Sequence, residues 1–241
     1  MAEGQRIVSA LLVAAGIAAA GWLVGGGFTK GRQGERTVQV KGLAERDVEA
    51  DAALWRLRFV ATDNELAKAQ AAIQKSQDAV FAFLERHGIL RAAVEIQALE
   101  VQDAYANIWG GAEVRSRFVI QQTLMVRSDR PEVVREASQG IGELVNAGVV
   151  LSNEGTGSGP IYLFTKLNEV KPRMIAEATA NARSAAEQFA KDSGSRLGAI
   201  RRASQGVFVI LPRDEAPGVT EEGQFHKRVR VVATIDYSLT E

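Results

Sequence analysis

The hydrophobic pattern begins with an uninterrupted apolar run close to the N-terminus. Residues 7–28 include no charged side chain, while Arg6 and Lys30 border them. A helix rises about 1.5 Å per residue, so about 20 apolar residues cross the ~30 Å hydrocarbon core of a bilayer. The run therefore predicts a transmembrane anchor at residues 7–29, preceded by an N-terminal tail at 1–6 and followed by a linker at 30–36. The large apolar side chains of this anchor are Ile7, Leu11, Leu12, Trp22, Leu23 and Phe28.

Two alternatives stay open for this segment: a cleaved secretion signal and a buried helix of a soluble domain. A signal peptide has an apolar core of about 7–15 residues and a small-residue cleavage site. Residues 18–20 are alanines and resemble such a site, but the apolar residues continue to Phe28. A retained signal-anchor is therefore the preferred interpretation. The flanking charges are nearly balanced, so the positive-inside rule is close to undecided; we expect a single-pass inner-membrane protein with its C-terminal body in the periplasm.

Residues 37–241 alternate between patterns typical of strands and of helices. Residues 37–43 and 52–62 are rich in β-formers and predict a hairpin around the charged stretch 45–51. Apolar residues then recur with a helical period from Leu66 to Leu84. Thr62 and Glu65 have capping-box spacing before this helix, and Gly88 follows as its stop.

Three more strand pairs and two more helices follow. Residues 94–101 and 117–127 predict the second pair. Residues 131–145 predict a helix with Pro131 in its first turn, weakened by Gly140 and Gly142. Residues 149–152 and 161–167 predict the third pair, and residues 199–211 and 226–239 the last. Between these two pairs lies the clearest helix, residues 172–192, whose apolar face comprises Met174, Ala178, Ala182, Ala185 and Phe189.

The resulting order of elements is ββαββαββαββ. Strands joined by short connections prefer antiparallel pairing, and the helices must cover one face of the sheet. The pattern therefore predicts an α+β protein, in which an N-terminal transmembrane helix precedes antiparallel strand pairs that alternate with single helices. The α+β body spans residues 37–241. It has a possible sub-domain division near residues 128–131 and no confident sequence repeat between the halves.

Composition excludes several classes of function. Lys plus Arg and Asp plus Glu both number 29, so the formal net charge is +0. Nucleic-acid binding relies on a basic field and is not expected here. The chain contains no cysteine, which excludes disulfides, thiolate catalysis and cysteine metal sites.

The residues that could carry chemistry form no recognised catalytic, cofactor or metal motif. Gly155, Gly157 and Gly159 resemble a phosphate loop, but a proline and a strand pattern follow them, so we expect a hairpin connection. His87 and His226 are the two histidines, and neither has a partner histidine or clustered carboxylates at metal spacing. We therefore expect both to have structural roles.

Two local patterns within the predicted strands have structural interpretations. Glu45, Asp47, Glu49 and Asp51 alternate with other residues and could present carboxylates on one strand face, as a cation site or an acid/base pair. The preferred interpretation is a solvated hairpin turn. Gly206 lies within a strand pattern and indicates a β-bulge or close backbone packing.

Three bulky side chains, Tyr105, Ile108 and Trp109, lie beside a Gly-Gly pair. Exposed together, they could anchor a neighbouring subunit, because aromatic residues are common at interfaces. The alternative is that they fold back onto their own sheet. They are the candidate oligomer contacts of this chain.

Two long blocks resemble a known family. VQVKGLAERDVEADAALWRLRF, from Val38 to Phe59, resembles the opening signature of the SIMPL-domain family, whose members are bacterial envelope proteins with no assigned biochemical role. KPRMIAEATANARSAAEQFAKDSGSRLGAIRRASQGVF, from Lys171 to Phe208, is similar to the second well-marked block of that family. The resemblance implies an exported or membrane-anchored α/β domain that forms large homo-oligomers shaped like rings or channels. It implies no catalytic residues.

These observations predict a non-enzymatic, membrane-anchored envelope protein whose exported body self-associates into a homo-oligomer through strand edges and loop aromatics. The alternative is an envelope module that binds a small molecule or a peptide, although nothing in the sequence names that ligand. An enzyme is disfavoured because the metal, thiol, triad and nucleotide signatures are all missing from the sequence. No cofactor and no nucleic-acid partner are expected.

Overall fold

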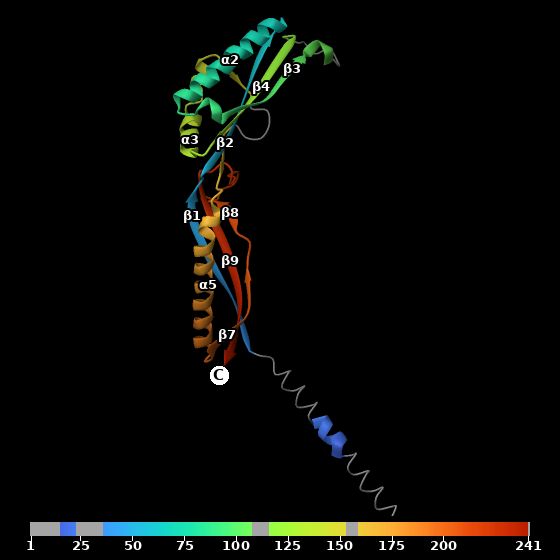
Figure 1. The fold of residues 1–241 in the computed structure, drawn as a ribbon, viewed down its shortest axis with the longest axis vertical. Helices are drawn as coiled ribbons and strands as arrows, with labels where there is room; N and C mark the ends of the chain where they lie inside the picture. Colours follow the sequence, from blue (N-terminus) through green and yellow to red (C-terminus); the bar gives the residue numbers. More distant parts are fainter. Residues whose placement is uncertain (1–14, 23–35, 108–115, 153–158, 241) are drawn as a thin grey trace, which may run out of the picture. The chain divides into compact units, whose positions relative to one another are not determined.

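The computed structural model describes residues 15–22, 36–107, 116–152 and 159–240 (Figure 1). The chain divides into two compact units, each of which combines helix and sheet. Unit 1 comprises residues 1–42, 179–205 and 233–241, and unit 2 comprises residues 43–178 and 206–232. The predicted α+β class with antiparallel sheets is confirmed.

The predicted transmembrane helix is wrong, because no helix in the described part of the chain is long and apolar enough to cross a membrane. Residues 15–22 of the predicted anchor are described and helical. Trp22 is 86% exposed. The same finding overturns the expected single-pass inner-membrane location with a periplasmic body. The other anchor positions, Ile7, Leu11, Leu12, Leu23 and Phe28, lie outside the described residues.

Unit 2 is built around a five-stranded sheet in the order β3-β4-β2-β5. β2 (Ala52–Asp63) and β4 (Phe118–Ser128) are its long central pair, antiparallel from Ala53 opposite Ser128 to Asp63 opposite Phe118. On the far side of β4 lies β3 (Val94–Asp103), flanked by the 3-10 helices η1 (Arg91–Ala93) and η2 (Ala104–Asn107). The other edge of β2 pairs with β5 (Val150–Leu151) and with β6 (Ile161–Leu163).

One face of this sheet forms the core of unit 2. Every second side chain of β2 is buried on that face, as the period of a strand dictates. α2 (Leu66–Arg86) covers the face with its own buried stripe, and Trp55 meets Phe83 edge-to-face with ring centroids 6.5 Å apart. Full burial of each such side chain contributes about 1.5–3 kcal/mol. The largest side chains in this core are Trp55, Leu57, Phe59, Ile73, Phe83, Leu84, Ile120 and Leu124.

Two short helices replace the single one predicted at residues 131–145. α3 (Pro131–Gln139) begins with its proline in the first turn, as expected, and ends at Gly140. α4 (Gly142–Asn146) then begins two residues later. The two glycines weaken the helix enough to break it, because each costs roughly 1 kcal/mol relative to alanine in a helix interior. The predicted stop at Gly88 is confirmed by its positive φ of 77°, which favours glycine.

The second sheet has the order β1 (Thr37–Glu49), β9 (His226–Thr240), β7 (Arg196–Gln205), and β8 (Val209–Pro212) also pairs with β9. In unit 1, α5 (Leu167–Asp192) packs on this sheet through alanines, which allow a close approach of helix and strands. The predicted helix began at residue 172 and placed Ala185 and Phe189 on the buried face. Both are exposed, because the buried positions recur every four residues: Met174, Ala178, Ala182, Ala186 and Ala190.

Strand pairing differs from the prediction in two places. β1 and β2 form no hairpin, since they belong to different sheets. β5 and β6 do not pair with each other, because each pairs with β2. The β3–β4 pair is confirmed, and so is the last pair, in which both β7 and β8 are antiparallel to β9. The ends of the body also meet: Leu239 N donates to Arg36 O at 2.7 Å in unit 1.

Asp51, between β1 and β2, fixes the start of α5 in unit 2. Its carboxylate accepts hydrogen bonds from Thr165 N at 2.9 Å, Thr165 Oγ1 at 2.8 Å and Lys166 N at 2.9 Å. Burial raises the pKa of Asp51, but these hydrogen bonds favour the ionised form, and the net pKa lies below its usual value. The carboxylate therefore stabilises the fold in its charged form.

We expect Asp51→Asn to destabilise unit 2 by about 1 kcal/mol at pH 7, the typical cost of losing a helix cap. Because the folded-state pKa is lowered, the contribution is present above the ordinary carboxyl pKa and disappears as the pH falls through the lowered value. Urea unfolding from pH 7 to pH 2 should therefore show the two proteins converging below about pH 4. Asp78→Asn on α2 is the control; an unchanged urea midpoint for Asp51→Asn would contradict this role.

We expect Gly206→Ala to destabilise the protein by about 1–3 kcal/mol through overpacking. Gly206 N donates to Val232 O at 2.8 Å, and an added Cβ would lie 2.7 Å from that same oxygen. The close backbone packing predicted at this glycine is confirmed. Gly142→Ala is the matched control, because a Cβ there meets nothing within 4 Å and should stabilise by about 0.4–1 kcal/mol. Equal urea midpoints for the two variants would refute this account.

Candidate functional site

The edge strand β3 of unit 2 carries three large apolar side chains that are exposed. Figure 1 shows β3 beside β4 at the border of the sheet. No described strand pairs with its outer edge, so the backbone N–H and C=O groups along that edge are available to another strand.

Three apolar side chains of β3, the edge strip Ile96, Leu99 and Val101, extend on the face that α2 covers elsewhere. They lie opposite Leu124, Gln122 and Ile120 of β4, which are almost completely buried. The strip itself is 47%, 49% and 54% exposed. Side chains that face the same layer are thus buried on β4 and half-exposed on β3. The sequence identified the strand, but its exposure was missed.

The opposite face of β3 carries Glu95 and Glu100. Glu100 Oε2 lies 3.5 Å from Arg58 Nη2 of β2, and Arg58 also donates to the side chain of Gln121. A β-bulge follows Ile96 and shifts the register of the strand. The edge is therefore apolar on one face and acidic on the other.

An ion pair fixes the C-terminal end of the edge strand. Arg117 Nη2 donates to Asp103 Oδ2 at 3.0 Å, and this guanidinium, together with the hydrogen bond from Tyr105 N, holds the pKa of Asp103 below its usual value. Arg117 Cζ also lies 5.8 Å from the centre of the Tyr105 ring. Tyr105 is 53% exposed in η2. Of the three candidate contact residues only Tyr105 can be placed, since Ile108 and Trp109 lie outside the described residues.

The acidic alternation of β1 is a row of contacts with basic side chains of β9, two of them ion pairs with arginine, and neither a cation site nor a hairpin turn. Glu45, Asp47 and Glu49 face β9 with separations of 3.5, 2.8 and 3.7 Å. The Arg228 guanidinium, which donates to Asp47, holds the pKa of that carboxyl below its usual value. Their partners on β9 are Arg230, Arg228 and His226. These carboxylates therefore hold the two antiparallel strands together.

Both histidines make structural contacts. The ring of His87 lies 4.6 Å from that of Phe83, and its Nε2 lies 3.3 Å from Glu143 Oε1. His226 packs against Phe225 with ring centroids 5.0 Å apart. Among residues 15–22, 36–107, 116–152 and 159–240, no group of three His, Cys, Asp or Glu side chains could hold a metal ion.

A buried lysine was missed by the sequence reasoning. Lys227 of β9 is completely buried, and its Nζ donates to Glu221 O at 2.7 Å and to the Glu221 carboxylate. A charged group is tolerated there because both acceptors belong to the preceding loop. No sequence signal distinguishes this lysine from an exposed one. It ties the connection between β8 and β9 to the strand.

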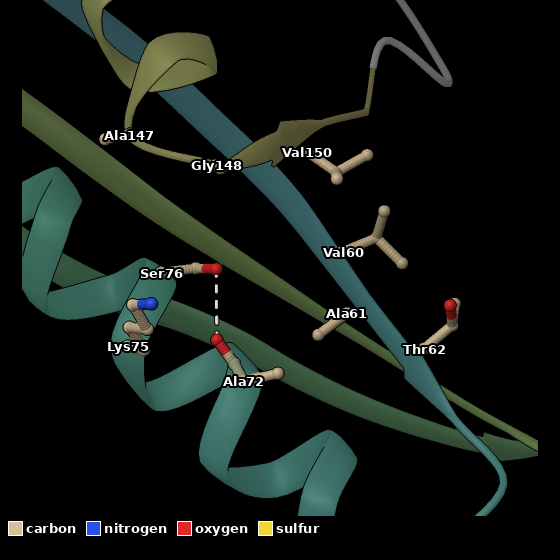
Figure 2. Close-up of a pocket in the computed structure, with 9 residues that line it drawn as sticks. All are labelled: Val60, Ala61, Thr62, Ala72, Lys75, Ser76, Ala147, Gly148 and Val150. Atoms are coloured by element: carbon tan, nitrogen blue, oxygen red, sulfur yellow. Dashed lines mark hydrogen bonds between the residues drawn. The ribbon is translucent and has the colours of Figure 1, made fainter.

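The described surface also contains pockets. Figure 2 shows one of about 390 Å³ between α2 and the β2–β5 edge, where Ser76 Oγ donates to Ala72 O within its own helix. That hydrogen bond engages the hydroxyl locally. A larger pocket of about 670 Å³ lies against the outer face of the sheet. Its lining includes Leu54, Arg56, Met125, Pro160, Ile161 and Glu222.

Comparisons with solved structures and curated proteins add little to this geometry. A crystal structure of a hydrolase from Listeria innocua aligns at 13% identity and a TM-score of 0.19, covering 81% of this chain and 91% of that chain. An uncharacterised conserved protein from Listeria innocua aligns at 14% identity and a TM-score of 0.17, covering 78% of this chain and 90% of that chain. Neither likeness carries an argument about fold or activity. No curated protein matches.

A comparison of the sequence with protein families identifies the family of this chain. Residues 38–235 match the SIMPL family, described as a protein of unknown function (DUF541). The match includes both blocks that resemble this family and nearly all of the described sheets. The chain therefore belongs to the SIMPL family.

Proposed function

We propose that this chain is a non-enzymatic assembly protein whose folded body binds further copies of itself through β3. The observation that carries the proposal is the edge strip, three half-exposed apolar side chains beside an edge that no described strand covers. Exposed edges template pairing with other chains, and soluble proteins usually shorten, charge or cover them. β3 is ten residues long and carries a β-bulge and three acidic side chains, but its apolar face remains half-exposed.

The energetics favour a contact made of backbone and side chains together. Full burial of an aliphatic side chain contributes about 1.5–3 kcal/mol, so burying the exposed half of the three strip residues contributes roughly 2–4 kcal/mol. Association itself costs about 4–15 kcal/mol in lost motion. The strip alone is insufficient, and hydrogen bonds along the edge must supply the remainder. A partner strand satisfies this requirement better than a flat surface does.

The double variant Leu99→Lys/Val101→Lys should weaken self-association of the full chain about tenfold or more, because it places charges in the buried part of the contact. Sedimentation velocity over a range of concentrations would measure this. Leu90→Lys/Val145→Lys is the matched control, since both leucine and valine there are exposed and lie outside β3. A monomeric wild type at every concentration, or equal association of both variants, would overturn the proposal.

A second candidate function is the binding of a small apolar carboxylate in the larger pocket. Its volume of about 670 Å³ lies within the ~300–1,000 Å³ typical of ligand sites. Leu54, Met125 and Ile161 provide apolar walls, and Arg56 provides a cationic group in a lining that also contains the acidic Glu222.

Isothermal titration of the full chain with dodecanoate would test this second candidate. Met125→Glu should weaken binding about tenfold or more, because it adds like charge to the wall that the carboxylate ligand must approach. Val150→Glu, in the smaller pocket of Figure 2, is the control. The absence of measurable heat with the wild type would eliminate this candidate.

A further inference from the structure

Each of the two sheets ends in a ten-residue strand with one edge that no described strand covers. β3 ends the sheet of unit 2 beside β4, and β7 lies in unit 1 beside β9. The charged side chains of β3 are all acidic and those of β7 all basic. They are Glu95, Glu100 and Asp103 in β3, and Arg196, Arg201 and Arg202 in β7.

The side chains of β3 can be placed by the β4 residues that face them. Glu95 and Glu100 share one face and are four positions apart along β4 (125 − 121 = 4). Ile96 and Leu99 lie between them on the other face, with the bulge separating the two. The strand therefore reads charge, apolar, bulge, apolar, charge. Glu95 faces Met125, Ile96 faces Leu124, Leu99 faces Gln122 and Glu100 faces Gln121.

β7 repeats this arrangement along β9 with the opposite charge. Arg196 and Arg202 are also four positions apart (240 − 236 = 4), and Leu197 and Ile200 lie between them on the other face. Register shifts separate the two apolar residues here as well. Arg196 faces Thr240, Leu197 faces Leu239, Ile200 faces Tyr237 and Arg202 faces Asp236.

We infer that β3 of one copy pairs antiparallel with β7 of a second copy. This inference rests on the self-association proposed above and names its partner surface. Antiparallel pairing is the commoner arrangement of adjacent strands, and directly opposite residues extend on the same face. The resulting pairs are Glu95 with Arg202, Ile96 with Ile200, Leu99 with Leu197, and Glu100 with Arg196.

The same pattern disfavours pairing between identical strands. Two copies of β3 in this register would place Glu95 opposite Glu100, and two copies of β7 would place Arg196 opposite Arg202. Like charges directly opposite each other destabilise a strand pair. The charges therefore select the unlike partner, while the apolar residues contribute equally to either choice.

Partners within each copy modify these charges. Glu100 is already 3.5 Å from Arg58, and Arg202 lies opposite Asp236, which accepts a hydrogen bond from Gln39 Nε2. When an exposed carboxylate already pairs with one cation, a second cation adds less interaction free energy than the first. The charges are accordingly expected to govern the choice of partner and the rate of encounter more than the strength of the contact.

When copies join through two different surfaces, a linear assembly has an unpaired β3 edge at one end and an unpaired β7 edge at the other. Such a heterologous contact closes into a ring or extends as a filament, whereas a contact between identical surfaces stops at a dimer. The β3–β7 contact thus predicts a closed ring or a filament in which each copy uses both of its edges.

Charge reversal tests the pairing directly, with the full chain and sedimentation velocity. Glu95→Lys/Glu100→Lys makes both edges basic, and Arg196→Glu/Arg202→Glu makes both acidic, so each variant alone should associate about tenfold or more weakly. Mixed in equal amounts, the two variants present matching edges and should regain large assemblies. Arg173→Glu/Glu177→Lys, at exposed positions of α5, is the control and should assemble as the wild type does.

The outcomes separate this inference from the proposed function. Large assemblies of the wild type that survive both reversals, or reversals that are not rescued by mixing, overturn the β3–β7 contact while self-association stands. A monomeric wild type overturns both. The chain has no native cysteine, so an Ile96→Cys copy and an Ile200→Cys copy provide a second test. Oxidation of their mixture should give the mixed disulfide in preference to either homodimer; equal yields of all three would also refute the pairing.

Discussion

The packing of a single helix, α2, against the sheet of unit 2 determines which side chains are buried there. An α-helix with its side chains is about 10 Å wide, and neighbouring strands lie about 4.8 Å apart, so one helix covers about two strands. α2 covers β2 and β4, and its aromatic contact between Phe83 and Trp55 lies over the first of them. β3 lies beyond this cover, which is why Ile96, Leu99 and Val101 are half-exposed while the residues opposite them are buried.

In unit 1 the helix that covers the sheet does so with smaller side chains. The part of α5 in that unit places alanines against the sheet, so helix and strands approach closely and the layer between them is thin. Little apolar area is buried per residue, and the larger contributions come from Val38, Ile235 and Tyr237 of the strands. A thin core also leaves β7 with exposed side chains along nearly its whole length.

Local periodicity carries much of the fold but not its pairing. α2, β3, β4 and the stop at Gly88 follow from patterns within about 20 residues, and the structure bears them out. The prediction of a hairpin between β1 and β2 was wrong, because the local sequence pattern is the same for two strands that pair with each other and for two strands that join separate sheets. The buried face of α5 was misplaced at Ala185 because an error of one residue rotates a helix by about 100°.

The candidate surface depends still more on distant parts of the chain. The sequence marks β3 as a strand, but only the width of the helical layer shows that its apolar face is left partly uncovered. Lys227 is similar: its burial follows from two acceptors on the loop before β9, a distribution that no residue pattern reveals. The acidic positions of β1 were visible in the sequence, whereas their cationic partners lie about 180 residues further along.

The hydrogen bond from Leu239 to Arg36 has a mechanical consequence. The first and last strands of the body are neighbours, so a force that pulls the two chain ends apart acts across the β1–β9 pair at its terminal rung. The rungs then break one after another instead of sharing the load. Stretching this protein from its ends should open it gradually from unit 1, at low force.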